Sequence, residues 1–196
     1  MLMEREPTSV LQAGDEISPI FESPLGLFGD SEMAKAIEKR YGIPKRRLTG
    51  TISPWAVKRL EAFGGDITRF SVIRLQPSRL KQICVAKTEP GDENNQDVSS
   101  LVGKVDIRKL ETFSQNDPDA YSFSGGLNRT TQGLMEFVEM FKAPIKMLHP
   151  LLTATQEGNY AGTENIGGIP YQGIILAHSN EAEWQGFKNN RNNEAF

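Results

Sequence analysis

The sequence predicts an α/β protein with a mainly parallel sheet, and three observations lead to this fold class. Short apolar runs at residues 8–13, 133–138 and 173–178 have the length of strands and are bounded by glycine or polar residues. Helical patterns alternate with these runs, as they do where helices connect parallel strands. The last two runs are almost continuously apolar, which is typical of strands buried on both faces.

The segment between the first and second strands is too long for an ordinary crossover. We therefore interpret residues 14–130 as a large helical insertion and residues 131–196 as the part that carries the functional strands. Three helices are expected in the insertion, beginning near Ser31, Pro54 and Pro77 and ending near Gly42, Gly64 and Lys87. A strand at 70–75, a short helix at 106–113, a helix at 143–156 and a hairpin or loop at 159–168 complete the expected elements.

Composition narrows the class of protein. The chain has 196 residues and a formal net charge of -3, which fits one globular domain or part of a larger one. This charge gives no indication of a nucleic-acid or membrane surface. No apolar run approaches the roughly 18 residues of a membrane span. The single cysteine, Cys84, excludes an internal disulfide framework, and we expect a cytoplasmic protein.

Polar side chains follow both of the later strands. Glu139 comes just after the run at 133–138, and Asn180 just after the run at 173–178. Carboxyl ends of neighbouring parallel strands meet at one edge of a sheet, where α/β proteins bind their ligands. A carboxylate there can orient a water for attack on a phosphate, and an amide can hydrogen-bond the γ-phosphate. Glu139 and Asn180 are therefore the candidate catalytic residues, and Asn180 is also a candidate nucleotide-binding residue.

A metal site is expected at the same edge. In phosphate-loop ATPases the residue before the catalytic Glu is usually an Asp that holds Mg²⁺, but here it is Val138. Glu136 projects to the same face as Val138 because strand side chains alternate, so Glu136 and Glu139 are the candidate metal ligands. The competing interpretation is that both are ordinary surface carboxylates, and that Asn180 is a turn residue.

Other motifs are weaker or missing. The chain contains no G-x-x-x-x-G-K-[ST] phosphate loop. The acidic run at 89–97 lacks the glycine and the final Glu of a calcium loop. The basic triplet at 45–47 has the chemistry to meet a phosphate, although such turns are usually only solvated.

Several segments resemble the bacterial PrkA proteins. They are Tyr41-Gly42-Ile43-Pro44, Ser53-Pro54-Trp55-Ala56 and residues 63–68, 86–97, 102–110 and 136–160. The resemblance covers nearly everything from about residue 10 onward, and runs of this length are specific. PrkA proteins are described as serine protein kinases with an AAA+ ATPase module, whose sheet has the strand order 5-1-4-3-2. The resemblance implies that residues 8–13, 133–138 and 173–178 are strands 2, 3 and 4.

The resemblance also implies cofactors and partners. It implies ATP and Mg²⁺ as cofactors, a protein substrate and a homo-oligomeric parent. From the net charge and the lack of a long apolar run we expect no nucleic acid and no membrane as partners. It places this chain in the middle of a longer protein, with the phosphate loop upstream and an arginine finger downstream. Two alternatives stay open: an AAA+ ATPase that remodels proteins without kinase activity, and a non-enzymatic regulatory module.

Overall fold

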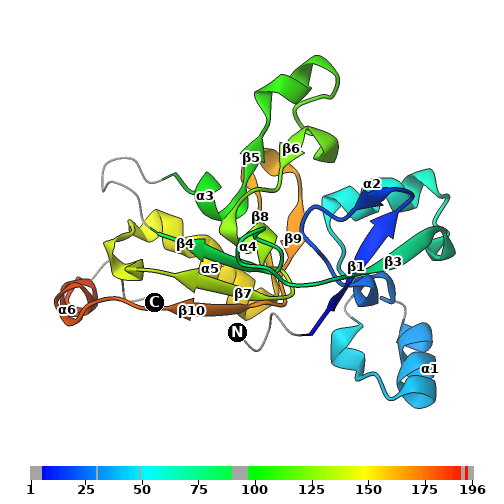
Figure 1. Ribbon diagram of the computed structural model, residues 1–196, viewed down its shortest axis with the longest axis horizontal. Helices are drawn as coiled ribbons and strands as arrows, with labels where there is room; N and C mark the ends of the chain where they lie inside the picture. The colour runs from blue at the N-terminus through cyan, green and yellow to red at the C-terminus, as the bar shows by residue number, and fades with distance from the viewer. Residues whose placement is uncertain (1–5, 30, 49, 90–96, 191–192, 194–196) are drawn as a thin grey trace.

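A computed structural model describes residues 6–29, 31–48, 50–89, 97–190 and 193. At its centre lies a three-stranded parallel sheet in the order β10-β7-β4 (Figure 1). These strands are β4 (Val85–Thr88), β7 (Leu134–Phe137) and β10 (Ile174–Ala177). Two of them are the strands expected at 133–138 and 173–178. The predicted parallel sheet is confirmed for this pair.

The strand at residues 8–13 is present, but its expected place in the parallel sheet is wrong. It forms β1 (Thr8–Ala13), which pairs antiparallel with β2 (Glu16–Ile17) and along its whole length with β3 (Phe70–Leu75). These strands form a separate sheet, on the right of Figure 1. The tight turn at Gly14, with a φ of 59°, returns the chain beside β1 and so fixes the antiparallel pairing.

The helix expected from Pro77 to Lys87 is also wrong. Gln82 and Cys84 have positive φ angles of 51° and 56°, which a helix does not allow, and a bridge joins Ser78 to Ile83. The chain then enters β4, which pairs with β7. In the strand order that the resemblance implies, β4, β7 and β10 take the places of strands 2, 3 and 4. The stretch 14–130 therefore contributes a strand to the parallel sheet and is not helical throughout.

The helices follow the expected start signals. Ser53 caps α2 (Pro54–Ala62) by accepting from the Ala56 N–H, and Pro54 occupies the first helical position. The helix expected at 106–113 is a shorter 3-10 helix at Ile107–Glu111. The remaining α-helices are α1 (Ser31–Tyr41), α3 (Ser99–Val102), α4 (Gly126–Arg129), α5 (Ile145–Glu157) and α6 (Glu181–Lys188).

Two short hairpins complete the fold. Strands β8 (Asn159–Ala161) and β9 (Gly168–Pro170) pair antiparallel, so the hairpin expected at 159–168 is confirmed. Strands β5 (Lys104–Val105) and β6 (Tyr121–Ser122) pair in the same way. In the part of the chain that the structure describes, no helix has the length and apolar character needed to cross a bilayer.

The described residues cover the parallel sheet mainly on one face. Met135 and Phe137 are fully buried in a core shared with α5 and with residues of α2 and β1. On the opposite face Ile174 and Leu176 of the edge strand β10 are 59% and 56% exposed. This differs from the two-sided burial that the apolar runs predicted. The exposed face lies beside the free edge of β10.

Candidate functional site

The turn after β7 places Glu139 at the carboxyl edge of the parallel sheet. The backbone there is left-handed, with a φ of 50° and a ψ of 45° at Glu139, which is uncommon for a residue other than glycine. Two hydrogen bonds tie this turn to the end of β10. The His178 N–H donates to the Phe137 carbonyl, and the Met140 N–H donates to the His178 carbonyl, both at 3.1 Å. The two turns that carry Glu139 and Asn180 are therefore adjacent.

Lys142 joins these two turns electrostatically. Its ammonium lies 2.9 Å from a Glu139 carboxylate oxygen and 3.3 Å from a Glu183 oxygen. The hydrogen bonds to Glu139 and Glu183 raise the pKa of Lys142. The Ser179 hydroxyl donates to Glu183 at 2.6 Å, and this bond together with Lys142 lowers the pKa of that carboxyl. Glu139 is thus connected through Lys142 and Glu183 to the turn after β10.

Asn180 is the N-cap of α6. Its side-chain oxygen accepts a 2.9 Å hydrogen bond from the Glu183 N–H. A side-chain amide also carries two N–H donors on its nitrogen, and a side-chain hydrogen bond from Asn180 helps to lower the pKa of the Glu183 carboxyl, after the larger effects of Ser179 and Lys142. The side chain is exposed to solvent. The cap and the contact with Glu183 fit the competing interpretation of Asn180 as a turn residue, and a phosphate-binding role of its nitrogen stays a prediction.

Aromatic packing holds α6 against the turn after β7. The ring of Phe141 lies 5.1 Å from the ring of Trp184 and 4.5 Å from that of Phe187, measured between centroids. A hollow of about 230 Å³ is lined by both turns, including Met140, His178 and Asn180. Glu139 is not among its lining residues. The structure thus brings Asn180 together with the turn of Glu139, while the Glu139 carboxylate itself points to Lys142.

Glu136 lies on the exposed face of β7, in a basic environment. Its carboxylate is 3.9 Å from both the Arg79 guanidinium and the His178 imidazole, and Lys87 is its neighbour in the register of β4. Among the residues that the structure describes, no group of three His, Cys, Asp or Glu side chains is arranged to hold a metal. The donor set around Glu136 and Glu139 therefore does not by itself form a magnesium cage. Mg²⁺ commonly needs only one or two carboxylates when the substrate's phosphates supply the other ligands.

Sequence reasoning did not identify Lys142 and Glu183 as site residues. Glu183 stands three residues after Asn180, the spacing of an N-cap and its acidic partner, so this signal was present in the sequence. Lys142 stands three residues after Glu139, which places the two side chains together only because a 3-10 turn follows the left-handed residue. That backbone conformation has no clear sequence signal at a glutamate.

A parallel sheet with a carboxylate and an amide on adjacent turns at its carboxyl edge belongs to the α/β proteins that bind ligands at this edge. The chain is a member of the PrkA AAA domain family, whose model matches residues 1–196. An AAA domain has a phosphate-loop NTPase fold, and the strand order β10-β7-β4 agrees with part of it.

Two curated relatives are similar over most of this chain. "Serine/threonine kinase YeaG" of Escherichia coli strain K12 is 66% identical over 195 residues, which is 100% of this chain and 30% of that protein. "ATP-dependent protease PrkA" of Bacillus subtilis strain 168 is 38% identical over 181 residues, which is 91% of this chain and 28% of that protein. The chain therefore spans about 30% of the length of the curated relatives that it matches.

Proposed function

We propose that this chain is the water-orienting and phosphate-sensing part of an ATP-hydrolysing module in a serine/threonine protein kinase. The observation that carries the proposal is the adjacency of the Glu139 and Asn180 turns in a chain that is 66% identical to a relative named as such a kinase. Bound ATP would supply the phosphoryl group. A cytoplasmic location and a homo-oligomeric parent belong to the same proposal.

Each residue has a distinct role in this proposal. Glu139 accepts a hydrogen bond from the attacking water through the carboxylate oxygen that Lys142 does not bind, so the ion pair with Lys142 is kept. The Asn180 amide nitrogen donates to a γ-phosphate oxygen, while its oxygen remains in the helix cap. Because the sequence contains no phosphate-loop motif, residues outside this chain would grip the β- and γ-phosphates.

Mg²⁺ is the expected companion of ATP. We propose that Glu139 contributes to its binding only in company with the nucleotide's phosphates, since no group of three metal-ligating side chains is found among the described residues. The metal-ligand role of Glu136 stays a prediction. A raised Mg²⁺ requirement of Glu136→Gln in the full-length protein would support it, and an unchanged requirement would assign Glu136 to a surface ion pair with Arg79.

A second candidate function is ATP-dependent proteolysis, because the 38% identical relative is named as a protease. One experiment separates the two. The full-length protein is incubated with γ-labelled ATP and casein, and both protein-bound label and casein fragments are followed on the same gel. The kinase proposal predicts label on serine or threonine of an intact protein. ATP-dependent casein fragments without protein-bound label would overturn it and support the protease.

A remodelling ATPase without kinase activity would give a third result. ATP would be hydrolysed, but neither label on protein nor fragments would appear. This outcome would leave the roles of Glu139 and Asn180 intact and would overturn the protein-kinase assignment alone.

A further inference from the structure

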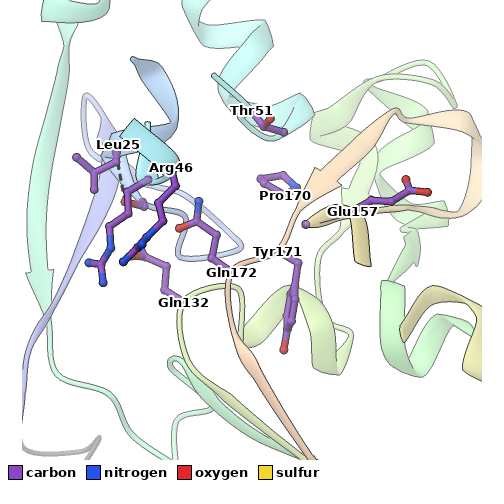
Figure 2. A pocket seen from close by; sticks show the side chains of 11 residues that line it. Leu25, Arg46, Thr51, Gln132, Glu157, Pro170, Tyr171 and Gln172 are labelled. Carbon is purple, nitrogen blue, oxygen red and sulfur yellow. Dashed lines mark hydrogen bonds between the residues drawn. The ribbon is translucent and has the colours of Figure 1, made fainter. Parts of the chain in front are cut away.

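A second polar cavity lies at the opposite edge of the parallel sheet from Glu139 and Asn180. It has a volume of about 620 Å³ and is shown in Figure 2. Gln132 and Gln172 line it, and each stands two residues before the start of β7 or β10, respectively. The cavity is therefore at the amino ends of these strands. The proposed catalytic turns are at the carboxyl ends, so this cavity is a separate site.

Two consecutive arginines carry the positive charge of the cavity. Arg46 and Arg47 belong to the 3-10 helix Lys45–Arg47, and both side chains are exposed at the cavity wall. Within the described residues, neither guanidinium makes an ion pair or hydrogen bond. Every other wall residue except Glu157 is uncharged. Two guanidinium groups that line one cavity and have no ion-pair partner among the described residues match a ligand with two negative charges, and arginine binds phosphate with paired hydrogen bonds.

The remaining walls present hydrogen-bond acceptors. The Gln132 side-chain nitrogen donates to the Phe21 carbonyl at 2.6 Å and to the Ser9 carbonyl at 3.0 Å, so the amide is fixed and its oxygen is left as an acceptor. Glu157 lines the cavity on the side away from Arg46 (Figure 2). Acceptors of this kind suit the N–H groups of a peptide backbone. They do not suit a free polyanion, because the Glu157 carboxylate would repel it.

We propose that this cavity binds a peptide segment through a phosphorylated serine or threonine, with the phosphate between Arg46 and Arg47. A phosphate monoester carries close to two negative charges at neutral pH, whereas an Asp or Glu side chain carries one. Clusters of arginine are a general means of recognising phosphorylated peptides. A cavity of about 620 Å³ also falls in the size range of sites for ligands larger than a single ion. This binding is independent of ATP hydrolysis and of Glu139.

Fluorescence anisotropy on the full-length protein tests the proposal. The probe is a fluorescein-labelled Gly-Gly-phosphoserine-Gly-Gly peptide, compared with the same peptide carrying Ser or Glu. We expect the phosphopeptide to bind at least about tenfold more tightly than either comparison peptide, because Ser makes no charged hydrogen bonds and the single charge of Glu matches only one of the two arginines. Arg46→Gln/Arg47→Gln should abolish this preference, and Lys45→Gln should retain it, since Lys45 has the same charge but does not line the cavity.

Several results would overturn the proposal. Equal binding of the phosphorylated and unphosphorylated peptides would exclude phosphate recognition. An unchanged affinity in the double variant, with its thermal melting also unchanged, would place the binding elsewhere. Competition by inorganic phosphate at the same concentration as the phosphopeptide would show an anion site without a peptide component.

The variant Arg46→Lys/Arg47→Lys tests the match of charges. If it still prefers the phosphopeptide, at reduced affinity, the result supports the proposed recognition of two negative charges.

Discussion

The ammonium of Lys142 lies 2.9 Å from Glu139 and 3.3 Å from Glu183, so one cation joins the turn after β7 to the helix that Asn180 caps. Both carboxylates are partly exposed, so the two ion pairs add little to stability. Their effect is to fix the position of a side chain. Glu139 is held at a defined place next to the carboxyl edge of the sheet.

Lys142→Met should lower the ATP turnover of the full-length protein by about tenfold and leave the KM for ATP nearly unchanged, because Glu139 is no longer held in position. Lys146→Met is the matched control, since Lys146 is exposed and makes no ion pair within the described residues. Steady-state kinetics would measure both variants. A turnover equal to that of the unmodified protein in Lys142→Met would show that the ion pair has no part in positioning Glu139.

A pair of substitutions at Asn180 separates the helix cap from the phosphate contact. Asn180→Asp keeps an oxygen that can accept from the Glu183 N–H but removes the amide donors, whereas Asn180→Ala removes both. Both variants should lose turnover by about 10²–10³. Only the alanine variant should also lose about 1 kcal/mol of stability. If Asn180→Asp hydrolyses ATP normally, the amide nitrogen does not contact the phosphate.

Glu22 should make stability depend on pH. Its carboxylate is buried and accepts hydrogen bonds from the Ser53 N–H and from the hydroxyls of Ser53 and Ser18. Burial raises its pKa above the ordinary value of 4.5, and these hydrogen bonds only partly oppose the shift. The folded state therefore holds the proton more tightly than the unfolded state. The contribution of Glu22 to the free energy of unfolding is therefore largest below pH 4.5 and is lost as the pH rises through the raised pKa.

The free energy of unfolding in urea, measured from pH 4 to pH 8, tests whether the contribution of Glu22 to stability falls as the pH rises. Each unit of pKa elevation costs about 1.4 kcal/mol at neutral pH. Glu22→Gln cannot titrate, so its advantage over the unmodified protein should grow as the pH rises. Glu61→Gln, at an exposed position, should retain the pH dependence of the unmodified protein. If the free energy of unfolding of Glu22→Gln instead falls further below that of the unmodified protein as the pH rises, the pKa of Glu22 is not raised by folding.

The edge strand β10 should cause the 196-residue chain to associate when it is produced alone. Among the strands that the structure describes it is hydrogen-bonded only to β7, and it exposes Ile174 and Leu176. Leu176→Lys should reduce the association, because a charge on an edge strand opposes pairing with another chain. Leu80→Lys is the control, since Leu80 is 99% exposed outside any strand. Light scattering that shows a monodisperse unmodified chain would contradict this prediction.

Local patterns predicted which segments form strands and helices better than how they pair. The cap at Ser53 and the apolar run of β7 act locally, so α2 and β7 were predicted close to their observed bounds. The partner of β1 depends on a turn and on β3 some 60 residues away. β4 has only four residues and follows the two left-handed residues Gln82 and Cys84, so the sequence has no alternating apolar pattern long enough to predict this strand.

The candidate site was predictable in position but not in geometry. The rule that polar residues after parallel strands share an edge placed Glu139 and Asn180 correctly on adjacent turns. The direction of each side chain depends on the left-handed backbone at Glu139 and on the cap at Asn180. Neither the ion pair with Lys142 nor the basic surroundings of Glu136 followed from spacing, because Arg79 and His178 reach Glu136 from other parts of the fold.

The most direct test of the central proposal is the ATP hydrolysis rate of Glu139→Gln in the full-length protein, with ATP affinity measured in parallel. We predict a loss of about 10²–10⁴ in turnover with nearly unchanged ATP affinity, because Glu139 orients the water and does not hold the nucleotide. Glu111→Gln, an exposed substitution of the same kind, should hydrolyse ATP normally. Hydrolysis by Glu139→Gln at the rate of the unmodified protein would contradict the assignment of this edge of the sheet as the catalytic site.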